Sequence, residues 1–135
     1  MKLMIMDGQG GGIAAALIKG LRRSLGNDLE ILAIGTNSMS TSAMLKAGAN
    51  KGATGENAVV QTAKNVDIII GPIAILMADS MMGEVTSKMA TAVSSSQAKK
   101  IIIPLTQENL RLVGVSAEPL PHLVDQVIEI IKAIK

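Results

Sequence analysis

A short apolar run at the start of the chain leads directly into a glycine-rich turn and then into a helical pattern. The run predicts a strand over Lys2–Met6, and four of the five residues after Asp7 are glycine. A wholly apolar strand is typical of the centre of a parallel sheet that is covered on both faces. Beyond the turn, large apolar residues recur at every fourth position, which indicates an amphipathic helix. These residues are Ile13, Leu17, Leu21 and Leu25.

Further apolar runs predict four more strands. Only six residues, 104–109, separate the last two runs, whereas a crossover between parallel strands needs about a dozen or more. We therefore expect the fifth strand to return as an antiparallel edge hairpin. Residues 49–55 are expected to be a small, flexible connection. The four runs are Leu29–Ile34, Val66–Ile70, Lys100–Ile103 and Leu110–Val115.

Helical patterns occupy the intervals between the strands. Pro72 suits a first helical turn, so Ile73–Met82 is expected to be helical. Hydroxyl side chains precede the other helical patterns and are candidate caps. The alternation of strands and helices predicts a single α/β domain over residues 1–135, arranged as a three-layer sandwich around a mostly parallel sheet of about five strands. The candidate caps are Ser38 or Ser40, Thr54 and Thr86, and the last helix carries an apolar stripe of Leu123, Val127, Ile130, Ile131 and Ile134.

The composition removes several classes of function. The chain has no Phe, Tyr or Trp, and its net charge is only +2, so it lacks the stacking rings and the basic surface that nucleic-acid binding requires. It has no Cys, which excludes thiolate chemistry and disulfides. Its longest apolar stretch, Ile68–Ala78, is interrupted by Gly71-Pro72, and we expect no membrane partner. The core must consist of aliphatic residues and nine Met.

The turn itself is the strongest functional signal. A strand, a glycine-rich turn and a helix are the context of a dinucleotide-binding fingerprint, in which backbone N–H groups and the helix dipole hold phosphate. Gly8 and Gly10 fit the motif G-x-G-x-x-G, but Ile13 occupies the position of its third glycine. Gly8 and Gly12 also fit the motif G-x-x-x-G-x-G, in which Ala14 occupies the position of the last glycine. The chain thus resembles the Rossmann superfamily, including the turn of short-chain dehydrogenases, over roughly its first 40 residues. Alternatively, the glycines only make a tight turn. The candidate ligand contacts here are Asp7, Gly8, Gln9, Gly10, Gly11 and Gly12.

The end of the second strand is the next place where such a ligand is held. Rossmann proteins carry an acid there that binds the adenosine ribose, but this chain has Thr36, Asn37 and Ser38. These side chains are candidates to hold a phosphate or a ribose, or Ser38 and Ser40 only cap a helix. Gly71 and Pro72 follow the third strand and should face the same crevice if that strand neighbours the first.

The ionisable residues near these motifs have open roles. Asp7 is a candidate to cap the loop, to contact a sugar hydroxyl or to hold Mg²⁺ through water. Glu56 and Glu84 are each a candidate general base or a surface charge. The single His122 is expected at the surface, and one histidine cannot build a zinc site. Short-chain dehydrogenases use a Tyr, which this chain lacks.

Six strings along the chain together resemble a short bacterial family of unknown function. The resemblance covers nearly the full length and implies a bacterial cytoplasmic protein, but it brings no established reaction and no catalytic residues. The strings are Asp7–Ile13, Gly35–Asn37, Met44–Ala49, Gly52–Ala58, Gly71–Ile73 and Ser80–Glu84.

The sequence therefore predicts a Rossmann-like domain that binds a nucleotide or dinucleotide at the glycine turn, with NAD(P) or another nucleotide as the candidate cofactor. One alternative is an enzyme that uses a nucleotide cofactor. Another is a ligand-free interaction module that presents Met77, Met81 and Met82 to a partner. We expect a homodimer, because small α/β domains often have to cover an apolar helix face.

Overall fold

A computed structural model describes residues 1–105 and 109–134 of the chain. Its centre is a five-stranded sheet in the order β3-β2-β1-β4-β5, and every pair of neighbouring strands is parallel. This arrangement confirms the predicted α/β Rossmann-like sandwich. The strands are β1 (Lys2–Asp7), β2 (Glu30–Gly35), β3 (Lys51–Thr54), β4 (Ile68–Pro72) and β5 (Lys99–Ile103).

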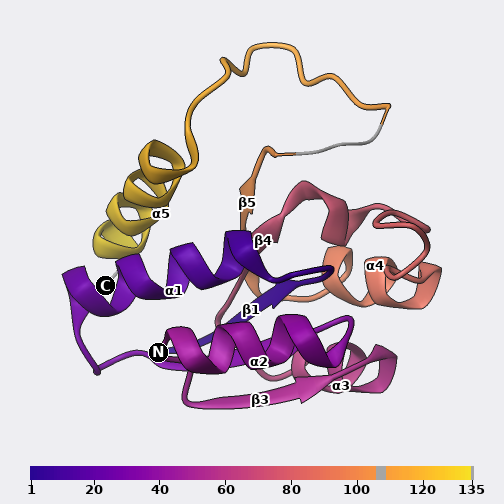
Figure 1. Cartoon of the computed structure of the whole chain (residues 1–135), viewed down its shortest axis with the longest axis horizontal. Helices are drawn as coiled ribbons and strands as arrows, with labels where there is room; N and C mark the ends of the chain where they lie inside the picture. The colour runs from indigo at the N-terminus through magenta and orange to yellow at the C-terminus, as the bar shows by residue number, and fades with distance from the viewer. Residues whose placement is uncertain (106–108, 135) are drawn as a thin grey trace.

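Helices cover both faces of the sheet and complete the three layers (Figure 1). Residues of α1, α2 and α5 pack on one face, and residues of α3, η1 and α4 pack on the other. No helix among the described residues is long and apolar enough to cross a membrane. The helices are α1 (Gly12–Leu25), α2 (Ser38–Ala47), α3 (Glu56–Thr62), the 3-10 helix η1 (Ile73–Leu76), α4 (Ser87–Ser94) and α5 (Leu120–Ile134).

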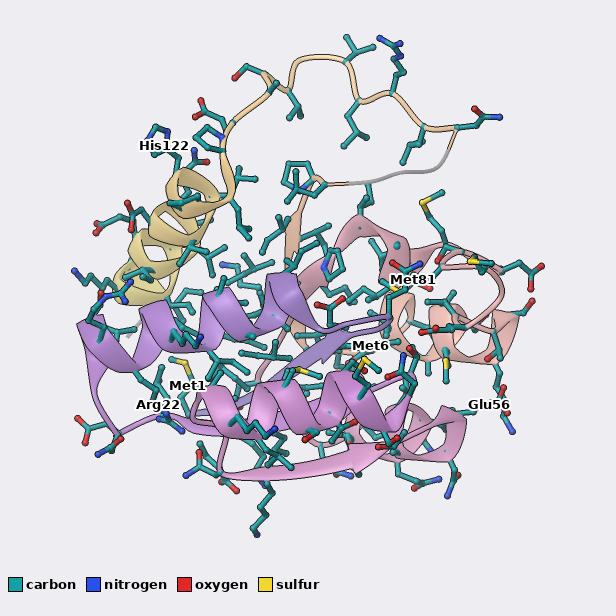
Figure 2. The ribbon with its side chains drawn as sticks, in the orientation of Figure 1. Met1, Met6, Arg22, Glu56, Met81 and His122 are labelled. Atoms are coloured by element: carbon teal, nitrogen blue, oxygen red, sulfur yellow. The ribbon has the colours of Figure 1, made fainter. Side chains whose placement is uncertain are left out.

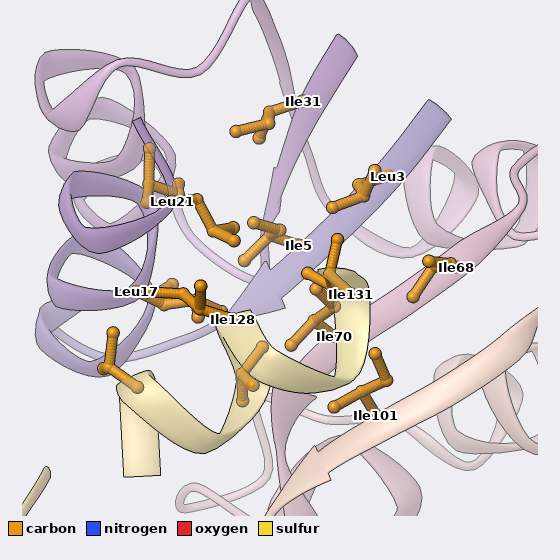
Figure 3. Packing of buried hydrophobic residues seen from close by; sticks show 14 of the residues in the cluster. Leu3, Ile5, Leu17, Leu21, Ile31, Ile68, Ile70, Ile101, Ile128 and Ile131 are labelled. Carbon is orange, nitrogen blue, oxygen red and sulfur yellow. The ribbon is translucent and has the colours of Figure 1, made fainter. Parts of the chain in front are cut away.

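The central strand β1 divides its side chains between two cores. Leu3 and Ile5 pack under α1 and α5, in the cluster shown in Figure 3, whereas Met4 and Met6 pack on the opposite face. All four are fully buried. This alternation follows from the pleat of the strand, which turns successive side chains to opposite faces. Because both faces of β1 are covered, its carboxyl end is held rigidly, and the glycine turn begins there.

The predicted fifth strand and antiparallel hairpin are wrong. Residues 110–115 form no strand, and the fifth strand is instead β3, within the segment expected to be a flexible connection. All four residues of β3 are exposed, so the strand lacks the apolar pattern that reveals a buried strand. Its pairing with the backbone of β2 defines it. In that segment Val113 and Val115 are exposed, and Leu110 and Leu112 are half-buried. Part of the connection that precedes it, residues 106–108, lies outside the described residues.

Several helices begin or end at other residues than the sequence predicts. Only residues 73–76 of the expected helix Ile73–Met82 are helical, as η1; turns follow, with Asp79, Met81 and Met82 at positive φ. Thr86 caps α4 as predicted, through a 3.1 Å bond from the N–H of Met89. The cap of α2 is instead Asn37, which accepts from the N–H of Ser40 at 2.8 Å.

The cap predicted for α3 is also wrong. Gly55 precedes that helix without a side-chain bond, and the hydroxyl of Thr54 pairs with that of Thr41 at 2.8 Å. The side chain of Thr54 therefore joins β3 to α2.

The final helix offers a matched test of the packing. Ile131 lies on the buried face of α5 and is fully buried, whereas its neighbour Ile130 in the same helix is 43% exposed. Ile131→Ala should lower the free energy of unfolding by about 2–5 kcal/mol, because it leaves a cavity in the core. Ile130→Ala makes the same chemical change and should cost less than about 1 kcal/mol. Urea denaturation measures both, and equal losses would contradict the packing of α5.

Candidate functional site

A cavity of about 390 Å³ lies at the carboxyl ends of β1 and β4. These strands are neighbours, but α1 leaves β1 over one face of the sheet and η1 leaves β4 over the other. The reversal opens a crevice, which is where ligands bind in open α/β sheets. Residues 7–13 of the glycine turn form most of the wall. Pro72, Ala74, Met81 and Leu105 complete it.

The carboxylate of Asp7 stabilises the conformation of the glycine turn through two hydrogen bonds. It accepts the N–H of Gly8 at 2.8 Å through Oδ1 and the N–H of Ala14 at 2.9 Å through Oδ2. The side chain is buried, and this burial raises the pKa of Asp7 above its ordinary value, against the two hydrogen bonds, which lower it. Asp7 therefore joins the end of β1 to the first turn of α1, which is the loop-capping role.

The four glycines of the turn divide into two kinds. A Cβ at Gly8 would come within 3.0 Å of Thr36, Met81 and Glu84, and Gly11 has a φ of 72° with the backbone of α2 close behind it. The fold itself therefore requires glycine at these two positions. A Cβ at Gly10 or Gly12 would meet nothing within 4 Å, and neither has a positive φ. Glycine at these two positions keeps the cavity wall free of side chains, although the fold does not require it.

The same segment carries unpaired backbone donors. The N–H of Ala14 binds Asp7, and the N–H of Ala15 begins the helical pattern by binding the carbonyl of Gly11 at 2.9 Å. Within the described part of the chain, the N–H groups of Gly10, Gly12 and Ile13 have no hydrogen-bond acceptor. Unpaired N–H groups in the first turn of a helix, together with the helix dipole, favour an anion.

Glu84 closes the side of the turn that faces β2. Its Oε1 accepts the N–H of Gln9 at 2.8 Å, the hydroxyl of Thr36 at 2.6 Å and the amide of Asn37 at 2.9 Å. The bond from Gln9, helped by those from the two side chains, lowers the pKa of Glu84, so it is ionised at neutral pH. The sequence places no acid at the end of β2, and the fold brings one there from residue 84.

The predicted site residues are only partly brought together. Thr36 and Asn37 bind Glu84 and lie outside the cavity wall, and Ser38 is exposed at the start of α2. Gly71 is also absent from the wall, and the backbone of Met6 packs so closely against it that a Cβ would lie 2.5 Å from the carbonyl oxygen of Met6. Pro72 and all six predicted turn residues do line the cavity. Sequence reasoning did not place Ala74, Met81 or Leu105 at this site; Met81 was considered only as part of a partner surface.

The remaining candidates lie elsewhere. Glu56 accepts from the hydroxyl of Thr86 at 2.6 Å, so it joins the start of α3 to the cap of α4. His122 is exposed and lies 3.2 Å from Glu118. Figure 2 shows both residues at the periphery, away from Met6 and Met81. Residues 1–105 and 109–134 contain no cluster of three metal-ligating side chains.

Comparisons with known proteins identify a family and a fold. Residues 2–135 match a family described as Domain of unknown function (DUF3842). No curated protein matches the chain. One solved structure that resembles it is the dodecameric FMN-dependent Ubix-like decarboxylase from Escherichia coli O157:H7, at 15% identity and a TM-score of 0.58, over 98% of this chain and 95% of that chain. At this identity the likeness shows the fold alone.

The two kinds of glycine should respond differently to alanine. Gly8→Ala should lower the free energy of unfolding by about 1–3 kcal/mol, because its methyl group overpacks the contact with Thr36 and Glu84. Gly10→Ala should leave stability unchanged or raise it by up to about 1 kcal/mol, because it restricts the unfolded chain without a clash. Thermal or urea unfolding compares them. A larger loss at Gly10 would show that the fold needs that glycine too.

Glu84 should give stability a defined dependence on pH. Its pKa is lowered by folding, so its contribution is present above the ordinary glutamate range and is lost as pH falls through the folded pKa. At pH 7, Glu84→Gln should cost about 1 kcal/mol, because the amide accepts the three hydrogen bonds more weakly. Unfolding curves at several pH values should show the gap between the two proteins closing in acid. A gap that is constant with pH would contradict the ionised network.

Proposed function

The chain belongs to the DUF3842 family, and we propose that within this fold it binds a small phosphate-bearing nucleotide, with the phosphate on the first turn of α1. The observation that carries the proposal is the pair Gly10 and Gly12. Neither position needs glycine for packing or for its backbone conformation, yet both line the cavity beside unpaired N–H groups. Close approach of a ligand to the backbone is the remaining reason for glycine there.

The shape of the site favours a mononucleotide over a dinucleotide. In dinucleotide-binding domains the adenosine ribose lies at the end of the second strand. Here the carboxylate of Glu84 occupies that place and uses the donors of Thr36 and Asn37. A cavity of about 390 Å³ is near the lower end of the range for small-molecule sites. NAD(P) in the usual Rossmann pose is therefore a weaker candidate than a ligand with one nucleotide unit.

Flavin mononucleotide is the first ligand to test. The structural neighbour is described as FMN-dependent, and the residues present here fit such a group. Ile13, Pro72, Met81 and Leu105 offer an apolar wall for a flat ring, while the turn offers N–H groups for the phosphate. A bound flavin would supply electron-transfer chemistry of its own. The only ionisable side chain in the described wall is Asp7, which already binds two N–H groups, so the protein's contribution is binding and orientation.

We also propose that the chain forms a homodimer or a larger assembly of copies. The structural neighbour is described as dodecameric, and several large apolar side chains of this chain are exposed. Of the three Met residues considered as a partner surface, Met82 is 96% exposed, whereas Met77 and Met81 are half-buried. Of these three residues, Met82 therefore offers the largest exposed surface to a partner.

A substitution that adds a negative charge to the first turn of α1 should weaken FMN binding without lowering the free energy of unfolding. Gly12→Asp should keep the free energy of unfolding or raise it by about 0.3–1 kcal/mol, because an acid at a helix N-terminus is favourable. It should weaken FMN binding at least about tenfold, because the carboxylate repels the phosphate and uses its donors. Thermal-shift titration and fluorescence with FMN, riboflavin, FAD and NAD⁺ measure this, and riboflavin should stabilise least because it has no phosphate.

The matched control places the same acid at another helix. Ser38→Asp adds a carboxylate to the first turn of α2, where Ser38 is exposed and outside the cavity wall, and it should leave FMN binding unchanged. Gly12→Asn has nearly the size of the aspartate without its charge and should bind FMN better than Gly12→Asp. Equal stabilisation of all these proteins by FMN, or of none of them, would contradict the proposed phosphate position.

A further inference from the structure

The long connection between β5 and α5 is the least explained part of the fold. Residues 104–119 join two elements that lie at the same end of the sheet, and the orange segment 109–119 arches away from the layers in Figure 1. We call residues 109–119 the arm. Its described residues, 104–105 and 109–119, form no helix or strand, and long connections are uncommon in compact domains.

The arm has the sequence of a strand but no partner within its own chain. Val113 is fully exposed and Val115 is 48% exposed, although valine is a strong strand former. Figure 2 shows side chains of the arm extending into solvent. Residues 109–117 form no hydrogen bond with the rest of the described chain. Within one chain, residues 113–114 form a turn with Gly114 at a φ of 85°, and pairing requires the arm to straighten there. An apolar segment with free backbone groups is suited to pairing with a sheet edge.

The sheet offers a matching edge at β5. This strand is the last in the order, so its outer side has no neighbour among the described strands. Natural edge strands are usually protected by charges, prolines or bulges. In β5 the lysines Lys99 and Lys100 stand at the start, and Ile101–Ile103 carry none of these devices. The edge is therefore apolar and unpaired over Ile101–Ile103, the end of β5 from which the chain continues toward the arm.

We propose that the arm of one copy of this chain pairs with the β5 edge of a second copy, as a sixth strand of its sheet. The proposal rests on the self-association proposed above and identifies its surface. Charge sets the direction of the pairing. A parallel arm would bring Arg111 beside Lys99 and Lys100, whereas an antiparallel arm places Arg111 at the Ile103 end, away from them. The added strand therefore runs antiparallel to β5.

The first experiment measures the mass of the assembly by sedimentation velocity over a wide range of concentration. The wild-type protein should sediment as an assembly of two or more chains. Val113→Asp should raise the dissociation constant at least about tenfold, because it places a charge in the buried strand pair. Its fold should be unchanged by circular dichroism, since Val113 is fully exposed within one chain. Ser42→Asp adds the same charge to an exposed position of α2 and should leave the mass unchanged.

The second experiment uses the absence of cysteine from the chain to locate the contact. Two single-cysteine proteins, Val115→Cys and Lys99→Cys, are purified separately, mixed and oxidised. A mixed disulfide between them is expected, because antiparallel pairing brings the end of the arm close to the start of β5. Val115→Cys mixed with Ser42→Cys is the control and should give none.

Each other outcome overturns the proposal in a distinguishable way. A stable assembly that Val113→Asp leaves intact, or Val115→Cys joined only to itself, would mean that copies associate through another surface. A wild-type protein that is monomeric at every concentration would overturn the proposed self-association as well. FMN binding does not depend on either result.

Discussion

The buried carboxylate of Asp7 is the interaction on which the site depends. It accepts the N–H of Gly8, the first glycine of the turn, and the N–H of Ala14 in the first turn of α1, and so joins the central strand to the helix. The N–H of Gly11 bonds to the carbonyl of Gly8 at 2.9 Å, and the N–H of Thr36 bonds to the carbonyl of Asp7 at 3.0 Å. The part of the cavity wall that the glycine turn forms is therefore backbone held in place by hydrogen bonds, and side chains such as Ile13 and Met81 form the rest.

A second carboxylate gives the site its asymmetry. Glu84 binds the opposite side of the same turn, and the two acids differ in their surroundings. Burial dominates at Asp7 and raises its pKa, whereas hydrogen bonds dominate at Glu84 and lower its pKa. Glu84 also adds to the raised pKa of Asp7 through charge repulsion. The result is a turn closed toward β2 and open toward β4, and for this reason we propose a mononucleotide as the ligand and not a dinucleotide.

The sequence predicted the parts of the fold that depend on local pattern. The apolar run of β1, the glycine turn and the spacing of α1 identified the sandwich and the first wall of the cavity. The pattern could not identify β3, because an exposed edge strand is defined by its neighbour and not by apolar residues. It misplaced residues 110–115 for the opposite reason, since their apolar pattern has no partner within one chain. Glu84 lies 47 residues or more from Thr36 and Asn37, so only the fold could show that it replaces the missing acid of β2.

Titration of ¹⁵N-labelled protein with FMN, followed at the backbone amides, tests the proposed phosphate position. The proposed phosphate position predicts that the amide resonances of Gly10, Gly12 and Ile13 shift most, because these N–H groups have no acceptor in the described chain. The amides of Thr36 and Asn37 should move little, because Glu84 separates them from the ligand. Shifts centred on Thr36 and Asn37, or no shift at the glycine turn, would contradict the account.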